Sequence, residues 1–213
     1  PFRRTYPKPR SSRGLLKREE KEEPREEISF IDVSPDFWGY EAIKSLSSKG
    51  IINGYKDGSF MPDNSITRAE FGKIVFTAFK LHADIPNPIQ FADVNEKEWY
   101  YDCLASLSAI GILKGEDGKI FPDREITREE AATLIKRCVD AVNSELKAQR
   151  ESSPFIDADE ISDYAKENVD ILYRAGVING DGTGRFCPKD NLSRGEASAM
   201  VYNVLNIIGG EIL

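Results

Sequence analysis

The chain has 213 residues, of which 40% are hydrophobic, 31% are charged and 10% are aromatic, and its formal net charge is −7. No apolar run approaches the roughly 20 residues that a membrane-spanning helix needs, so we expect no insertion into a membrane. The excess of acidic over basic residues argues against nucleic acid as a partner, because affinity for phosphates comes mainly from basic surface. A single histidine, His82, removes most metal sites and catalytic triads, so we expect no metal and no cofactor.

Residues 1–27 differ in composition from the rest of the chain. They hold nine basic residues, six glutamates and four prolines, with few apolar residues to bury. Such a segment is typical of a disordered linker. The first residues lack the apolar stretch of a signal peptide, so the chain is either intracellular or a piece of a longer secreted protein. Because the chain begins in a linker, we expect the missing remainder on its N-terminal side.

Three copies of one pattern follow, at offsets of 61 and 64 residues. Each copy begins with Phe-x-Asp, continues to a Trp or Tyr, and reaches a glycine twelve residues after that aromatic residue. Apolar residues between the aromatic residue and the glycine recur three apart, which predicts a helix of about ten residues that ends at the glycine. The repeat boundaries that we expect are 28–85, 86–150 and 151–213.

A second helix in each repeat begins at a capping box, in which Thr67, Thr127 or Ser193 is followed three residues later by Glu. Positions +4, +7, +8, +11 and +12 after the capping residue are apolar in all three copies. Such a stripe predicts three long helices that pack against each other. The expected fold is mainly α: three tandem helix-loop-helix repeats forming a pseudo-threefold trimer around a central three-helix bundle. We interpret Cys138 and Cys187 as small core residues, and Cys103 as a structural residue as well.

An arginine occupies the first helical position after each capping residue, at Arg68, Arg128 and Arg194. A cation is mildly unfavourable there because of the helix macrodipole. One explanation is structural: an ion pair with an acidic residue such as Asp63 or Asp123, or packing of the arginine side chain. The other is that the guanidinium and the helix N-terminus jointly bind a carboxylate or phosphate. On the second explanation, Arg68→Ala should scarcely change stability.

The ordered pattern over residues 28–208 resembles the S-layer homology repeats of bacterial cell-surface proteins, which usually occur as three tandem copies. It comprises Phe-x-Asp-Val, Trp, Gly-Ile-x-x-Gly, Asp-Gly-x-Phe-x-Pro and Ile-Thr-Arg-Ala-Glu, here residues 66–70. The resemblance implies grooves between adjacent repeats that bind anionic, often pyruvylated, secondary cell-wall polysaccharide. It also implies an extracellular location, in the cell wall or S-layer of a Gram-positive-type envelope, and a larger protein covalently continuous with the N-terminal side.

The resemblance also assigns candidate binding residues. The family's arginine maps onto Arg68, Arg128 and Arg194, and its binding loop maps onto the residues at and before each aromatic: Asp36, Trp38, Lys97, Trp99 and Tyr164. For the two tryptophans, packing in the core or between repeats is the favoured alternative to sugar stacking. Repeat three departs from the pattern at four positions, which are Ala158, Tyr164, Lys189 and Gly195.

Three functional classes remain open from the sequence. The first is a non-catalytic anchor that tethers a larger secreted protein to the envelope. The alternatives are a helical scaffold for a protein partner and a carbohydrate-active enzyme that uses two carboxylates. Because the distinctive polar residues recur in all three copies, we favour repeated binding of a repeated polymer, with no catalytic residues.

Overall fold

The computed structural model describes residues 29–82, 91–152 and 155–209. The predicted linker, residues 1–27, lies outside this part. Each repeat contributes an outer helix and then a central helix, and no strand element occurs among the described residues. The outer helices are α1 (Tyr40–Ser48), α3 (Tyr101–Ala109) and α5 (Asp163–Arg174); the central helices are α2 (Arg68–Ala78), α4 (Arg128–Ala141) and α6 (Arg194–Ile207). A short 3₁₀ helix, Ala158–Glu160, precedes α5.

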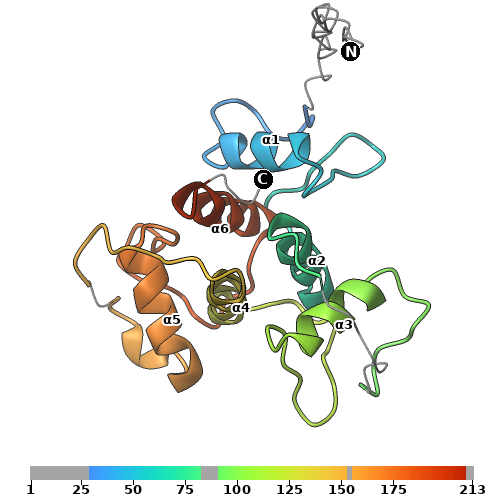
Figure 1. Ribbon diagram of the computed structural model, residues 1–213. Helices are drawn as coiled ribbons and strands as arrows, with labels where there is room; N and C mark the ends of the chain where they lie inside the picture. Colours follow the sequence, from blue (N-terminus) through green and yellow to red (C-terminus); the bar gives the residue numbers. More distant parts are fainter. Residues whose placement is uncertain (1–28, 83–90, 153–154, 210–213) are drawn as a thin grey trace, which may run out of the picture.

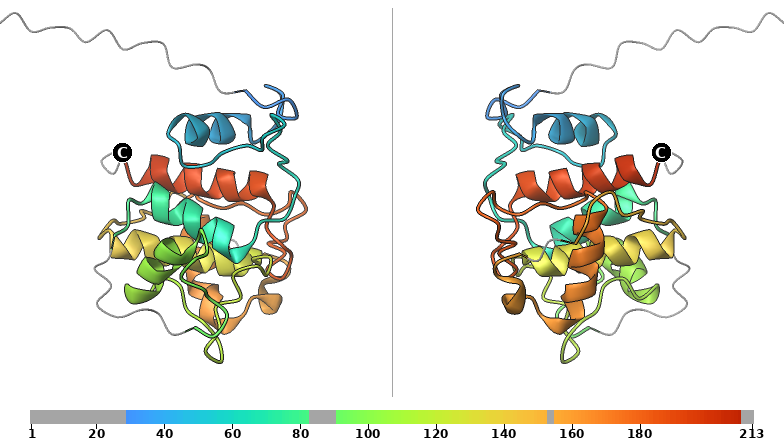
Figure 2. Two further views of the ribbon diagram at one scale, coloured as in Figure 1. Left: turned by 90° about the vertical axis from the view of Figure 1, so that its right-hand side faces the viewer. Right: turned by 90° about the vertical axis from the view of Figure 1, so that its left-hand side faces the viewer.

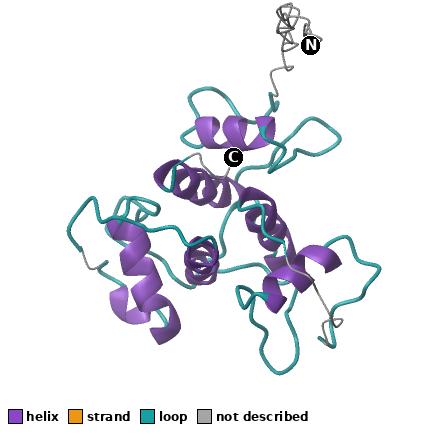
Figure 3. Ribbon diagram, in the orientation of Figure 1, coloured by secondary structure: helices purple, strands orange, loops and turns teal. Residues whose placement is uncertain are grey.

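The central helices α2, α4 and α6 contact one another, and the outer helices lie around them (Figures 1 and 3). Each outer helix packs on the central helix of the preceding repeat, α3 on α2 and α5 on α4. The first outer helix, α1, packs on α6 from the last repeat, and the side views show these two helices next to each other (Figure 2). The predicted pseudo-threefold arrangement around a three-helix bundle is confirmed, and the contact of α1 with α6 closes it into a ring.

The local signals in the sequence produce the expected helix ends. Thr67, Thr127 and Ser193 each form a complete capping box with the glutamate three residues later. The outer helices are followed by Gly50, Gly111 and Gly176, whose φ angles of 68°, 77° and 82° are in the left-handed region. All fifteen residues of the predicted apolar stripes are buried. The stripes therefore form the interior of the bundle, as predicted.

Backbone hydrogen bonds also link the three repeats in a closed cycle just before the central helices. The amide of Ile66 donates to the carbonyl of Leu192 (3.0 Å), that of Leu192 to Ile126 (2.9 Å), and that of Ile126 to Ile66 (3.0 Å). The three side chains are fully buried. Because each repeat supplies one donor and one acceptor, no repeat can complete the cycle alone.

The aspartate of each Phe-x-Asp start fixes the loop that leads to the central helix. In repeat one, the Asp32 carboxylate accepts the amides of Phe60 and Met61 at 2.8 and 2.7 Å, and Asp93 and Asp157 make the equivalent pairs of bonds. The second residue in each loop that donates its amide to the aspartate has a positive φ, which is 56° at Met61 and 57° at Cys187. Cys187 is only partly buried, so the expectation that it is a core residue is wrong.

Candidate ligand-binding grooves

Three grooves surround the bundle, and each has one of the predicted arginines on its wall. Groove 1 contains Arg68 and has a volume of about 340 Å³. Groove 2 contains Arg128 and has about 470 Å³, and groove 3 contains Arg194 and has about 230 Å³. Each groove takes its arginine from one repeat, a loop and the capping-box glutamate from the next, and an aromatic residue from the third. Each groove thus involves all three repeats, whereas the resemblance implied grooves between adjacent repeats.

The aromatic residues of the pattern lie at the groove rims. Tyr164 lines groove 1, Trp38 groove 2 and Trp99 groove 3. Trp38 is 63% exposed, Trp99 60% and Tyr164 51%. The favoured expectation that the two tryptophans are packing residues is therefore wrong. Asp36 and Lys97 are exposed and do not belong to the lining of these grooves.

The three arginines share two hydrogen bonds that the sequence did not predict. Each Nε donates to a loop carbonyl of the next repeat around the ring, at 2.8–2.9 Å: Arg68 to Ile120, Arg128 to Phe186 and Arg194 to Phe60. Each Nη2 donates to a second carbonyl of the same repeat, at 3.0–3.4 Å: Lys114, Asn179 and Asn53 respectively. The arginine therefore joins neighbouring repeats in all three places.

The helix N-termini are also satisfied by the protein itself. The first two amides of α2, at Arg68 and Ala69, donate to the carbonyls of Arg124 and Pro122, both at 2.9 Å. The third donates to the Thr67 hydroxyl at 3.2 Å. The starts of α4 and α6 show the same arrangement. The hypothesis that guanidinium and helix N-terminus jointly bind an anion is wrong, because these amides already have acceptors.

The third nitrogen of the guanidinium distinguishes the grooves. Nη1 of Arg68 pairs with Glu130 at 3.2 Å, and Nη1 of Arg128 pairs with Glu196 at 2.6 Å. These partners are capping-box glutamates of the next repeat, not Asp63 or Asp123 as the sequence suggested. In groove 3, no ion pair of Arg194 is found within the described ranges; its guanidinium lies over the rings of Tyr55 and Phe60, 5.0 and 4.6 Å from their centroids.

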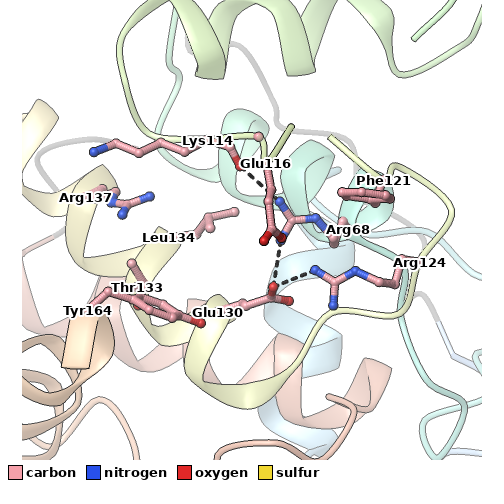
Figure 4. Close-up of a pocket in the computed structure, with 11 residues that line it drawn as sticks. Arg68, Lys114, Glu116, Phe121, Arg124, Glu130, Thr133, Leu134, Arg137 and Tyr164 are labelled. Atoms are coloured by element: carbon pink, nitrogen blue, oxygen red, sulfur yellow. Dashed lines mark hydrogen bonds and ion pairs between the residues drawn. The ribbon is translucent and has the colours of Figure 1, made fainter. Parts of the chain in front are cut away.

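Arg68 in groove 1 is the most enclosed of the three arginines. Arg68 is only 6% exposed. Burial lowers the pKa of its guanidinium, although the negative charge of Glu130 acts in the opposite direction. Glu130 also pairs with Arg124 at 2.6 Å, so one carboxylate holds two cations (Figure 4). Arg124 stands where the other repeats have Asn64 and Asp190. Groove 1 therefore has an ion-pair cluster that the other two lack.

A second polar cluster near groove 1 explains two positions at which repeat three departs from the pattern, Tyr164 and Lys189. Glu129, at the position of Ala69 and Gly195, is 3% exposed and pairs with Lys189 at 2.6 Å. It also accepts hydrogen bonds from Ser162 and from the Tyr164 hydroxyl, the latter at 3.1 Å. Burial raises the pKa of Glu129, but these partners outweigh burial and leave the pKa below its usual value. The cluster fixes the aromatic residue of groove 1.

Two further positions, which the recurring motif does not include, differ among the grooves. The loop residue whose carbonyl accepts from Nη2 is Lys114 in groove 1, Asn179 in groove 2 and Asn53 in groove 3. The position ten residues into the central helix is Arg137 in α4, Asn203 in α6 and Thr77 in α2. Aligning the three repeats and looking for positions with unequal charge would have identified both.

Within residues 29–82, 91–152 and 155–209, no group of three or more His, Cys, Asp or Glu side chains could hold a metal ion. No helix in the same ranges is long and apolar enough to cross a membrane.

Known proteins share this pattern. The family model for the S-layer homology domain matches residues 29–71, 90–132 and 154–198. The chain is 37% identical over 141 residues to the Surface-layer 125 kDa protein of Lysinibacillus sphaericus, covering 66% of this chain and 11% of that protein. It is 34% identical over 118 residues to the Cellulosome-anchoring protein of Acetivibrio thermocellus, covering 53% and 26%. It is 30% identical over 181 residues to Exoglucanase XynX of the same species, covering 85% and 16%.

The chain therefore spans about a quarter or less of the length of these relatives. Surface-layer and anchoring proteins among them place the chain at the cell surface or in the cell wall. The three family-model matches together cover more than half of the sequence, and the chain belongs to the S-layer homology family.

Proposed function

We propose that the chain is a non-catalytic anchoring module that binds anionic secondary cell-wall polysaccharide in its three grooves. The acidic groups of that polymer, such as pyruvyl groups on an amino sugar, are the ligands that we assign to the basic side chains. A larger secreted protein that contains this module is tethered in this way. The anchoring relative supports the proposal, and the enzyme relative supports a module that is attached to different cargo.

One observation carries the proposal: a solvent-exposed aromatic ring and a cation line the same cavity in all three grooves. A hydrophobic ring that is half exposed or more gains little from folding, whereas the flat face of a sugar can cover it in a complex. A polymer with repeated acidic sugars can occupy several such grooves at once, which raises avidity without a new type of contact.

The arginines contribute differently in the three grooves. Arg194 has the guanidinium best placed for an acidic sugar, because its Nε and Nη2 hold the loop and no carboxylate pairs with it in the described part of the chain. Arg128 pairs with Glu196, whose side chain is 36% exposed, so a ligand carboxylate can compete for it. Arg68 is enclosed, and we assign it a mainly structural role in groove 1.

A binding role fits the carboxylates of the grooves better than catalysis does. The capping-box glutamates, Glu70, Glu130 and Glu196, each accept the backbone amide of their own capping residue at 2.9–3.1 Å. A carboxylate that is fixed by capping is poorly suited to exchange protons with a substrate. An acid and a base in contrasting environments, which glycoside hydrolysis requires, would also not recur threefold.

The test is a pull-down on purified bacterial sacculi, with and without removal of the acid-labile polysaccharide. We expect the chain to bind intact sacculi and to lose binding when the polysaccharide is removed. The variant Trp38→Ala/Trp99→Ala/Tyr164→Ala should bind much more weakly. Ile31→Ala, at a residue that is 81% exposed, is the control and should bind as the wild type does.

A scaffold for a protein partner predicts another result. Binding that survives removal of the polysaccharide, or that is unaffected by loss of all three aromatic rings, would contradict the proposed function. Melting temperatures recorded for every variant separate loss of binding from loss of the fold.

A further inference from the structure

Groove 1 has a different charge from the other two grooves. Its lining contains four basic residues, Arg68, Lys114, Arg124 and Arg137, and two acidic ones, Glu116 and Glu130, a formal charge of +2. Groove 2 has one basic residue, Arg128, against Asp181 and Glu196, a formal charge of −1. Groove 3 has Lys73 and Arg194 against Glu70, a formal charge of +1.

Lys114 and Arg137 distinguish groove 1, because the corresponding residues of the other two grooves are uncharged. Arg68 and Arg124 are both held by Glu130. The ends of the Lys114 and Arg137 side chains lie on the side of the pocket opposite Arg124 (Figure 4). Among the described residues neither side chain makes an ion pair, and Glu116, the other carboxylate of the groove lining, pairs with neither of them.

Arg137 is fixed next to the loop that carries Lys114. Its Nη1 donates to the carbonyl of Ile112 at 2.9 Å, two residues before Lys114. Burial lowers the pKa of the Arg137 guanidinium, as expected for a cation that has lost water without gaining a carboxylate. In groove 2, Asn203 makes the equivalent bond to the carbonyl of Val177 at 3.1 Å. An uncharged side chain therefore satisfies this carbonyl equally well, and the bond alone does not require an arginine.

We propose that groove 1 binds a glycan segment that carries two negative charges, with Lys114 and Arg137 holding the acidic groups. Grooves 2 and 3 have asparagine or threonine at these two positions and take segments with a single charge. The inference rests on the proposed function, since it names the class of ligand for one of its grooves. A partly buried guanidinium and a flexible ammonium can bind two separate carboxylates, or a carboxylate and a phosphate.

The chain itself offers the matched variants. Lys114→Asn/Arg137→Asn gives groove 1 the residues of groove 2 and keeps a donor for the Ile112 carbonyl. The reciprocal variant, Asn179→Lys/Asn203→Arg, gives groove 2 the residues of groove 1. The probe is wall polysaccharide released from sacculi by mild acid, cut to short fragments and separated by ion exchange into singly and doubly charged fractions.

Calorimetry at low salt should show that Lys114→Asn/Arg137→Asn loses at least tenfold in affinity for the doubly charged fraction at one site, and stays within twofold for the singly charged fraction. The reciprocal variant should gain a second strong site for the doubly charged fraction. Equal affinities of wild type and both variants for the two fractions would overturn the inference. A wild type that binds the singly charged fraction but no doubly charged fraction would also overturn it. A wild type that binds neither fraction would instead contradict the proposed function.

Discussion

The centre of the molecule and the rims of its grooves follow the threefold repeat to different degrees. At the centre, the cycle through Ile66, Ile126 and Leu192 and the Nε and Nη2 bonds of the arginines recur in all three repeats. At the rims, the Nη1 partner, the aromatic residue and the two positions at Lys114 and Arg137 differ. We therefore assign stability to the interactions that recur at the centre, and ligand preference to the residues that vary at the groove rims.

The largest expected effect comes from opening the ring. A fragment of residues 86–150 has α3 without α2 and α4 without α5, so both helices expose apolar faces that are buried in the chain. We expect this fragment to show no cooperative thermal transition, since a repeat of about 60 residues buries too little surface alone. Calorimetric melting of the fragment beside the whole chain checks this. A fragment that melted as cooperatively as the chain would show that the closed centre is unnecessary.

The next effect separates two arginines that have the same place in the motif. Arg68→Ala removes donors from two carbonyls and leaves Glu130 with one cation instead of two, so we expect a loss of about 2–4 kcal/mol in unfolding free energy. Arg194→Ala removes the equivalent two bonds but no ion pair with a described residue, and should cost about 1–2 kcal/mol. Denaturant unfolding of both variants provides the values. Equal losses would indicate that the Glu130 cluster adds nothing to the centre.

This prediction replaces the expectation, drawn from sequence, that Arg68→Ala would leave stability unchanged. The capping boxes, the terminating glycines and the apolar stripes were predictable because they depend on residues within a few positions of each other. The contact of α1 with α6, and the carbonyls that accept from Arg68 more than 40 positions away, depend on how the repeats pack. The exposure of Trp38 and Trp99 was not predictable for the same reason, because each ring lies beside residues of other repeats.

A smaller effect tests the capping residues, which belong to the recurring centre. Thr67→Ala removes the acceptor for the Glu70 amide and should cost about 1 kcal/mol, with the same cost for Thr127→Ala. Polysaccharide affinity should not change, since neither hydroxyl lines a groove. A variant with lowered affinity and normal melting temperature would place the capping residue among the binding residues instead.

The smallest effect concerns the rim cluster at Glu129 and its dependence on pH. The pKa of Glu129 is lower in the fold than its ordinary value of 4.5, so its contribution to stability is present above about pH 4.5 and is lost as pH falls through the folded pKa. Relative to Glu129→Gln, the wild type should be more stable at pH 7, and this difference should shrink below pH 4.5. Unfolding curves of both proteins between pH 3 and pH 7 measure it; a difference that stayed constant would mean that the carboxylate charge is not involved.

The most direct measurement of the division between centre and rim is calorimetric titration of a singly charged wall-polysaccharide fragment into Arg194→Ala and Arg68→Ala, with unfolding free energies recorded for both. We expect Arg194→Ala to lose at least tenfold in affinity at one groove, which corresponds to about 1.4 kcal/mol. Folded Arg68→Ala should bind within about threefold of the wild type, although it loses more stability. If Arg194→Ala kept full affinity, or if both variants lost affinity only in proportion to their unfolding, the account would be contradicted.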